Sequence, residues 1–97
     1  MHLIEISVRK NKITVSGHAG YAAAGKDIVC AGVTALTMSL VKSINDLTDD
    51  KIEYEISPGR VDIHCGNLSE AGMLLVNSFF IGICLIAEKY PNNVRIV

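Results

Sequence analysis

Two short segments near the start of the chain alternate between apolar and polar residues. They run from Leu3 to Val8 and from Lys12 to Ser16, with Asn11 near the turn between them. Because successive side chains of a strand point to opposite faces, this alternation predicts a β-hairpin with one apolar face. That face would be formed by Ile4, Ile6, Val8, Ile13 and Val15.

The apolar residues change to a helical spacing in two longer segments. The first runs from Asp27 to about Leu47 and the second from Ser69 to about Tyr90, and each predicts a long helix. Asp27 is the expected N-cap of the first helix, because its carboxylate can accept a hydrogen bond from a free amide of the first turn.

Two further strands are predicted between the helices and one after them. Residues 51–56 and 61–65 alternate on either side of a Pro58-Gly59 turn, and Val94 to Ile96 form a short last strand. The order ββαββα(β), with one polar face on each strand, predicts an α+β fold: a two-layer α/β sandwich whose single sheet carries both helices on one face. With 97 residues, the chain is expected to form a single domain, residues 1–97.

The second predicted helix is apolar nearly all round between Met73 and Ala87. Such a helix must be buried on more than one side, and we expect the interface of a homodimer to provide the second cover. The alternative is that the sheet and the first helix enclose it. The apolar run is shorter than the roughly 20 residues of a membrane span, and Asn77 interrupts it, so no membrane contact is expected.

Composition narrows the function. Nine Lys+Arg against ten Asp+Glu give a net charge of −1, which argues against nucleic-acid binding, because domains that bind nucleic acid usually carry a basic surplus. An apolar content of 49% with 20% charged residues excludes a disordered chain. The acidic residues Asp46, Asp49, Asp50, Glu53 and Glu55 are interpreted as a solvated turn and strand face, and the alternative is a surface that attracts a basic partner. The start of the sequence lacks the basic and apolar regions of a signal peptide, so a cytoplasmic location is expected.

The chain has three cysteines, Cys30, Cys65 and Cys84, and no CxxC pair. This number and spacing fit neither a disulfide framework nor a four-ligand zinc site. His64 and Cys65 are adjacent in a predicted strand and would point to opposite faces, so they are a poor pair of metal ligands. No metal or cofactor is expected, and Cys65 and Cys84 are interpreted as buried, unreactive core residues.

The candidate chemistry lies where the hairpin is followed by the first helix. His18 directly follows a strand, Cys30 lies in the first helical turn, and the segment between them, Gly17 to Lys26, is predicted to be a loop because it is rich in glycine. A helix N-terminus and a nearby imidazolium both stabilise a thiolate, and free first-turn amides can hold an oxyanion. These residues suggest a Cys30–His18 pair for nucleophilic catalysis. A buried cysteine and a solvated histidine are the alternative interpretation.

A competing motif occupies the same loop. Gly20 to Lys26 matches the first seven positions of the phosphate-binding pattern G-x-x-x-x-G-K-[ST]. The eighth position is Asp27, where a Ser or Thr hydroxyl should meet magnesium. The preceding strand also belongs to a hairpin rather than to a βαβ unit, so this interpretation is the weaker one.

Several residues of this region together carry a family signature. They resemble the signature of the ribosomal-processing cysteine protease (Prp) family, and they are Gly17-His18-Ala19, Gly25, Asp27-Ile28-Val29-Cys30-Ala31 and Ala35-Leu36. The resemblance implies a two-layer α/β sandwich that forms a homodimer, with Cys30 as the nucleophile and His18 as its base. It also implies a substrate: the precursor of large-subunit ribosomal protein twenty-seven, whose N-terminal extension is cut after an aromatic residue.

Further residues have supporting roles under this resemblance. Four residues after the cysteine the family usually has Ser, and this chain has Thr34, which keeps the hydroxyl and adds a methyl group. The loop would close over the peptide with Gly20 and Gly25 as hinges. Asp27 would cap the helix or turn its carboxylate to His18 and orient the imidazole. The rival hypothesis is a non-catalytic dimeric module that binds a ribosomal protein through the same groove.

Overall fold

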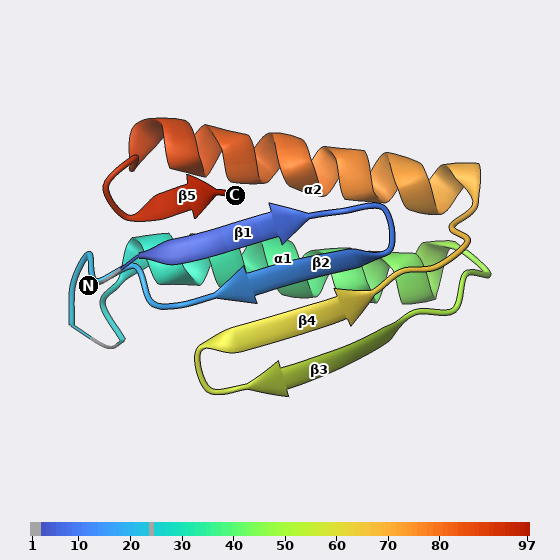
Figure 1. Ribbon diagram of the computed structural model, residues 1–97, viewed down its shortest axis with the longest axis horizontal. Coiled ribbons are helices and arrows are strands. Elements are labelled where there is room, and N and C mark those ends of the chain that lie inside the picture. Colours follow the sequence, from blue (N-terminus) through green and yellow to red (C-terminus); the bar gives the residue numbers. More distant parts are fainter. Residues whose placement is uncertain (1–2, 24) are drawn as a thin grey trace.

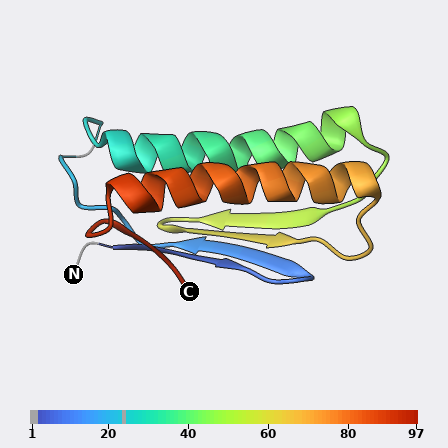
Figure 2. The same ribbon diagram turned by 90° about the horizontal axis from the view of Figure 1, so that it is seen from above.

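Five strands form one layer of the structure and two helices form the other (Figures 1 and 2). The computed structural model describes residues 3–23 and 25–97; Ala24, which belongs to the predicted loop, lies outside the described residues. The elements are β1 (Ile4–Val8), β2 (Lys12–Ser16), α1 (Ile28–Leu47), β3 (Glu53–Ser57), β4 (Arg60–His64), α2 (Glu70–Lys89) and β5 (Val94–Ile96). Their order and both layers confirm the predicted α+β sandwich. Strand β3 begins two residues and ends one residue later than expected, and β4 begins and ends one residue earlier.

The sheet has the strand order β3-β4-β2-β1-β5. The strands β1 and β5 are parallel, and the other neighbours are antiparallel. The predicted apolar face is confirmed in the hairpin, because Ile4, Ile6, Ile13 and Val15 are buried in the core. In β4, Ile63 pairs with Ile13 and is fully buried as well. The core therefore lies between the middle of the sheet and the helices.

The edge strand β3 departs from the expected pattern. Its residues alternate, but all five are exposed, and Tyr54 and Ile56 keep 47% and 57% of their surface accessible. Two helices of about 10 Å diameter cover roughly four strands at a spacing of about 4.8 Å, and β3 lies beyond that width at one edge. The apolar face of β3 therefore borders solvent.

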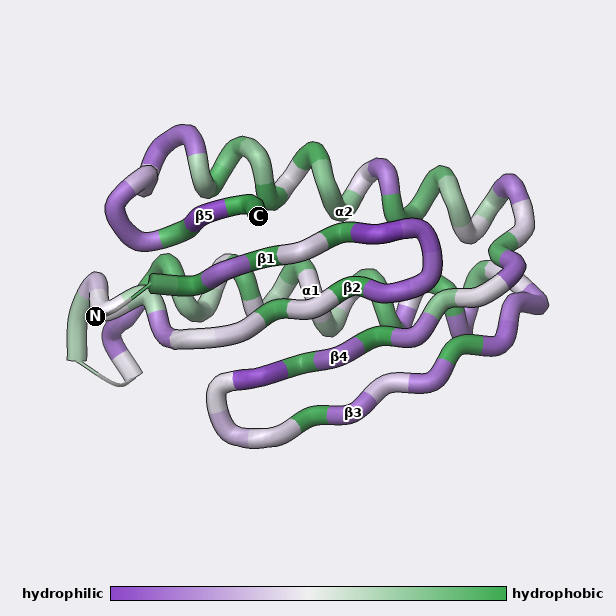
Figure 3. Tube along the Cα trace, in the orientation of Figure 1, coloured by the Kyte–Doolittle hydropathy of each residue, from purple (hydrophilic) through white to green (hydrophobic). Residues whose placement is uncertain are grey.

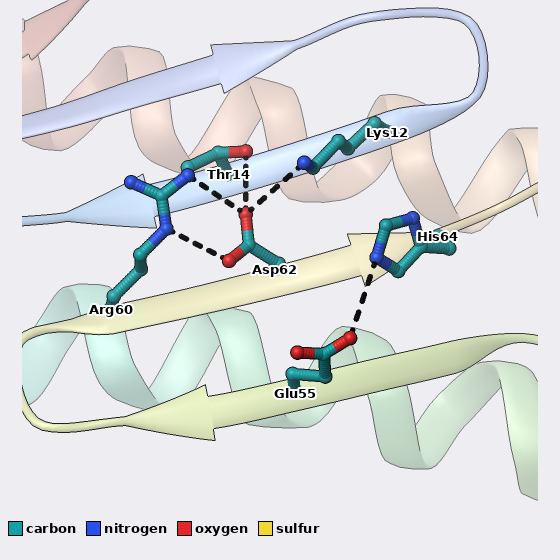
Figure 4. Close-up of polar contacts among 6 residues, drawn as sticks. All are labelled: Lys12, Thr14, Glu55, Arg60, Asp62 and His64. Carbon is teal, nitrogen blue, oxygen red and sulfur yellow. Dashed lines mark hydrogen bonds and ion pairs between the residues drawn. The ribbon is translucent and has the colours of Figure 1, made fainter.

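The other face of the sheet carries ion pairs (Figure 4). At their centre, Asp62 of β4 accepts hydrogen bonds from Arg60 Nε at 2.8 Å and from the Thr14 hydroxyl at 3.0 Å. The ammonium group of Lys12 lies 3.7 Å from the same carboxylate. These contacts, with the Arg60 hydrogen bond the largest cause, lower the pKa of Asp62 from 3.8 to about 2.

Two glycines let α1 and α2 approach each other closely. A Cβ atom added at Gly82 would lie 2.9 Å from Leu36 Cδ1, and one added at Gly32 would lie 3.4 Å from Ile86 Cδ1. The Gly82 contact is closer than real Cβ atoms make, so Leu36 would have to move. The absence of side chains at these two positions is therefore part of how the helices pack.

Much of the apolar surface of α2 remains exposed. Only Gly72, Phe79 and Ile83 of this helix are buried, and Figure 3 shows apolar colouring along most of its length. The exposed large apolar side chains, with 36–69% of their surface accessible, are Met73, Leu74, Phe80, Ile81 and Leu85. The alternative in which the sheet and α1 enclose this helix is therefore wrong. Cys84, expected to be buried, is only partly buried, because it lies beside this exposed face.

The length argument against a membrane span does not hold for these helices. Both α1 and α2 have 20 residues and are apolar enough to cross a membrane by length and composition alone. Core helices of soluble proteins meet the same criteria, and both helices here pack on the sheet. Length and composition therefore do not distinguish a membrane span from a core helix for α1 and α2.

Asp50 differs from the predicted solvated acidic turn. Its carboxylate accepts hydrogen bonds from the backbone amide of Ser69 at 3.1 Å and from the Ser69 hydroxyl at 2.8 Å. Ser69 is the N-cap of α2 and accepts the Gly72 amide. Asp50 thus fastens the connection after α1 to the start of α2.

Candidate active site

The loop between β2 and α1 begins with a tight contact to the sheet. Gly17 has a φ of +97°, and a Cβ atom there would overlap the carbonyl of Leu3. Its amide donates to the Gly59 carbonyl at 2.8 Å, which joins the loop to the β3–β4 turn. Only glycine can adopt this φ and leave room for the Leu3 carbonyl. The fixed backbone of Gly17 sets the direction in which the next residue, His18, leaves the strand.

His18 and Cys30 border the same two hollows of the surface. The loop-side hollow lies over the first turns of α1, and its lining includes Gly25, Asp27 and Thr34 beside the pair. The strand-side hollow lies between α1 and the β3–β4 hairpin. Its lining includes, besides the pair, Thr34, Met38, Ile56 and Gly59. The structure therefore places the histidine and the cysteine, which are twelve positions apart in the sequence, around the same two hollows.

His18 is exposed, and Cys30 is partly buried in the first turn of α1. Gly59, with a φ of +70°, passes directly beside the imidazole, since an added Cβ would lie 3.0 Å from His18 Nε2. Any side chain at position 59 would displace the ring. The turn between β3 and β4 thus forms one wall of the histidine site.

Ala19 links the loop to the cysteine. Its amide donates to Cys30 Sγ at 3.3 Å, and its side chain is fully buried. Its carbonyl accepts a hydrogen bond from Asn93 Nδ2 at 2.8 Å. Farther along the loop, the ring of Tyr21 meets that of Tyr90 edge to face, with 5.3 Å between the centroids. Tyr90 directly follows α2, and Asn93 lies in the connection to β5. No local pattern in the sequence predicts that either residue contacts the loop.

Asp27 is confirmed as the N-cap of α1. Its Oδ1 atom accepts the amides of Val29 at 3.0 Å and Cys30 at 2.9 Å. Its Oδ2 atom accepts the loop amides of Tyr21 at 3.0 Å and Ala22 at 3.4 Å. The pKa of Asp27 is lowered by these bonds, chiefly by that from the Cys30 amide.

These bonds change two expectations drawn from the sequence. The sequence offers the free amides of the first helical turn as oxyanion donors, but the Asp27 cap accepts those of Val29 and Cys30. The same carboxylate accepts two of the loop amides that a phosphate group would need. The phosphate-loop interpretation therefore has no support in the geometry.

The remaining predicted site residues surround this centre. Gly20 and Gly25 have φ values of +63° and +84°, which glycine adopts without strain. Thr34 lies one helical turn beyond Cys30 and borders both hollows. Within residues 3–23 and 25–97, no group of three or more His, Cys, Asp or Glu side chains is arranged to hold a metal ion.

Cys65 differs from Cys30 in its surroundings. It is 2% exposed, and burial raises its pKa, so the thiol form is favoured. The prediction that Cys65 is a buried core residue is confirmed. Of the three cysteines, Cys30 is the one in the first turn of a helix, and it borders the same hollows as His18; a cysteine and a histidine at one site are typical of cysteine-dependent hydrolases.

Comparison with known proteins identifies the family to which the chain belongs within this class. The sequence model of the family described as cysteine protease Prp matches residues 3–95, and the chain belongs to this family. A relative in Staphylococcus aureus, named ribosomal processing cysteine protease Prp, is 29% identical over 99% of this chain and 97% of its own. A relative of the same name in Mycoplasma genitalium is 28% identical over 97% of this chain and 94% of its own.

Solved structures share the fold. The S. aureus Prp protease in complex with a covalently linked product peptide matches with a TM-score of 0.88 and 25% identity, over 99% of this chain and 97% of that one. The SMU.848 protein of Streptococcus mutans matches with a TM-score of 0.81 and 30% identity, over 98% and 92%. The chain is accordingly a cysteine protease with the α+β fold of its family.

Proposed function

We propose that this protease removes the N-terminal extension from the precursor of a large-subunit ribosomal protein that resembles protein twenty-seven, in the bacterial cytoplasm. The names of the S. aureus and M. genitalium relatives support a ribosomal substrate, and the product peptide bound covalently to the S. aureus enzyme supports a covalent mechanism. The observation that carries the assignment in this chain is Cys30 Sγ, which accepts the Ala19 amide at a helix N-terminus and borders the same hollows as His18.

Cys30 and His18 are the reacting side chains of the proposed mechanism. His18 takes the proton of the Cys30 thiol, and the thiolate attacks the scissile carbonyl carbon. When the tetrahedral intermediate collapses, the C–N bond breaks and His18 returns the proton to the leaving amine. A water molecule, deprotonated by His18, then attacks the thioester carbonyl, which releases the carboxylic acid and restores the thiol.

The supporting residues hold this pair in place. Asp27 fixes the first turn of α1 and the loop through four backbone amides. Thr34 offers its hydroxyl from the wall that both hollows share. Gly20 and Gly25 supply the backbone freedom for the loop to close over a bound peptide.

The strand-side hollow suits the apolar residue expected before the cleavage site. Its walls include Val33, Met38 and Ile56, three apolar side chains from α1 and β3. A flat aromatic side chain that enters this hollow would be desolvated beside Cys30, where the scissile carbonyl must lie. This placement supports cleavage after an aromatic residue.

A homodimer through α2 completes the proposal. Five large apolar side chains of this helix are exposed along one side, and contiguous patches of this kind usually mark an interface. A second copy of the same helix would cover them in a symmetric contact. The proposed active site lies at the other side of α1 and would remain open.

The decisive experiment is mass spectrometry of the precursor ribosomal protein after incubation with the protease. We expect loss of the N-terminal extension with the unmutated chain, and no cleavage with Cys30→Ala or His18→Ala. Cys65→Ala and Cys84→Ala are matched controls that should retain cleavage, because neither thiol lies at a helix N-terminus. Cleavage by Cys30→Ala would reject the proposal, and binding without cleavage by the unmutated chain would favour the non-catalytic module.

A further inference from the structure

Asn93 reaches the active-site loop from a distant part of the chain. It follows Ala19 by 74 residues, and its Nδ2 atom donates to the Ala19 carbonyl at 2.8 Å. Figures 1 and 2 show that the connection between α2 and β5 lies at the same end of the molecule as the loop before α1. The side chain therefore joins the connection before β5 to the loop of the proposed catalytic centre.

The backbone of Asn93 is itself fixed. Its amide donates to the Tyr90 carbonyl at 3.0 Å, and its carbonyl accepts the Ile4 amide at 2.9 Å, where β1 begins. Both backbone groups are thus bound, one to the end of the helix and one to the sheet. The side-chain amide extends toward the loop from a rigid support.

The Asn93 side chain holds Ala19, whose backbone carbonyl and amide are both hydrogen-bonded. Ala19 is held at its carbonyl by Asn93, and its methyl group is fully buried. Its amide donates to Cys30 Sγ at 3.3 Å. A hydrogen bond to a charged acceptor is stronger than one to a neutral acceptor, and the attacking group of the proposed mechanism is the Cys30 thiolate.

We propose that Asn93 is a positioning residue for Cys30, which acts by holding the Ala19 carbonyl so that the Ala19 amide remains directed at Sγ. This inference rests on the proposed role of Cys30 as the nucleophile. The residues that line the two hollows come from the loop, α1, β1, β2 and the β3–β4 hairpin, and Asn93 stands outside them. Its effect therefore passes through Ala19 and not through the bound peptide.

The variant Asn93→Leu tests the proposal, because leucine has a similar size and cannot donate a hydrogen bond. We expect kcat for peptide cleavage to fall about tenfold, equivalent to roughly 1.4 kcal/mol, while KM stays within about twofold because no substrate contact is lost. Alkylation of Cys30 by iodoacetamide at pH 7 should slow by a similar factor. Asn92→Leu, the same change at the exposed neighbouring position, should leave both rates unchanged.

Three results would overturn the proposal. The first is that kcat and the alkylation rate are both unchanged in folded Asn93→Leu. The second is that this variant changes KM alone. If Asn93→Leu does not fold, the unmutated protein provides a test by NMR. The Ala19 amide proton resonance must move when Cys30 ionises, because this amide donates to Sγ. The third result that would overturn the proposal is a resonance that stays fixed. Failure of the proposed function has a different signature, a fully active Cys30→Ala. Unchanged rates in Asn93→Leu beside an inactive Cys30→Ala would reject the Asn93 inference alone.

Discussion

The Asp27 carboxylate joins two backbone segments through one side chain. One oxygen accepts first-turn amides of α1, and the other accepts the loop amides of Tyr21 and Ala22. An asparagine side chain has one acceptor oxygen and one NH₂ donor, so it can serve the helix or the loop but not both. Because Asn caps a helix about as well as Asp, Asp27→Asn should keep the helix and release the loop.

We expect Asp27→Asn to retain its melting temperature and to lose about tenfold in cleavage activity, roughly 1.4 kcal/mol of barrier. Thermal unfolding by circular dichroism and peptide cleavage, measured on the same preparation, check this. Asp27→Ala is the control that removes both functions, and it should also lose about 1 kcal/mol of stability through the missing cap. A loss as deep as that of His18→Ala, with the fold intact, would instead make Asp27 a third catalytic residue.

At the scale of single residues, local spacing predicts what is local in the structure. Cys30 at a helix start, Asp27 as its cap and His18 after a strand follow from patterns within twenty residues. The bond between Asn93 and Ala19 does not, because only the parallel pairing of β5 with β1 brings the two together. The cap is local as well, and because Asp27 accepts the Cys30 amide, this first-turn donor is not free for an oxyanion.

At the scale of the elements, the packing of α1 on α2 depends on glycine at position 82. We expect Gly82→Val to lower the free energy of unfolding by about 1–3 kcal/mol, because its branched side chain must displace Leu36 from a close contact. Gly82→Ala should cost less, since the helix propensity of alanine offsets up to about 1 kcal/mol. Urea denaturation measures both. Gly66→Val, where an added Cβ meets nothing within 4 Å, is the control, and equal stability of Gly82→Val and the unmutated chain would contradict the packing argument.

The ion pairs on the open face of the sheet predict a pH dependence. The native pKa of Asp62 is about 2, below its ordinary value of 3.8, so the folded chain binds this proton less readily than the unfolded chain. The stabilisation is therefore complete above about pH 4 and is lost as the pH falls toward 2.

Urea unfolding at pH values between 2 and 5 measures this loss. Asp62→Asn should be less stable than the unmutated chain at pH 5, and the difference should shrink as the pH falls. Asp49→Asn, an equal charge change at an exposed position of the turn after α1, should leave the pH profile unchanged. A constant difference between Asp62→Asn and the unmutated chain across this range would show that the ion pairs do not set the pKa.

The alternating residues of β3 show what a pattern within one element can predict and what it cannot. They predict the strand correctly, yet they cannot say that β3 lies at the edge, where α1 and α2 no longer cover its apolar face. Strand order depends on the pairing of β2 with β4, which are separated by α1 and β3 in the sequence. That pairing is a property of the assembled sheet.

At the scale of the whole molecule, the exposed side of α2 predicts the assembly. Ile81→Asp should convert a homodimer into monomers, because an unpaired charge buried in the interface costs about 3 kcal/mol or more, over a hundredfold in the dissociation constant. Ile81 is 63% exposed in the single chain, so its replacement should leave the fold intact. Sedimentation at micromolar concentration measures the assembly.

Ile56→Asp is the matched control for this change. Ile56 has a similar exposure of 57% but lies on β3, at the edge of the sheet farthest from β5. This variant should remain dimeric. A monomeric unmutated chain under the same conditions would reject the α2 interface.

The proposed role of the contact between Asn93 and Ala19 also has a consequence for the synthesis of the enzyme. Both proposed reacting side chains are present once residue 30 has been added, but the residues that hold their loop, Tyr90 and Asn93, come sixty or more positions later in the sequence. A nascent chain that stops before this point carries the cysteine and the histidine without the support for Ala19. We therefore expect a chain to reach full activity only after residue 93 has emerged and the Asn93 side chain can hold the Ala19 carbonyl.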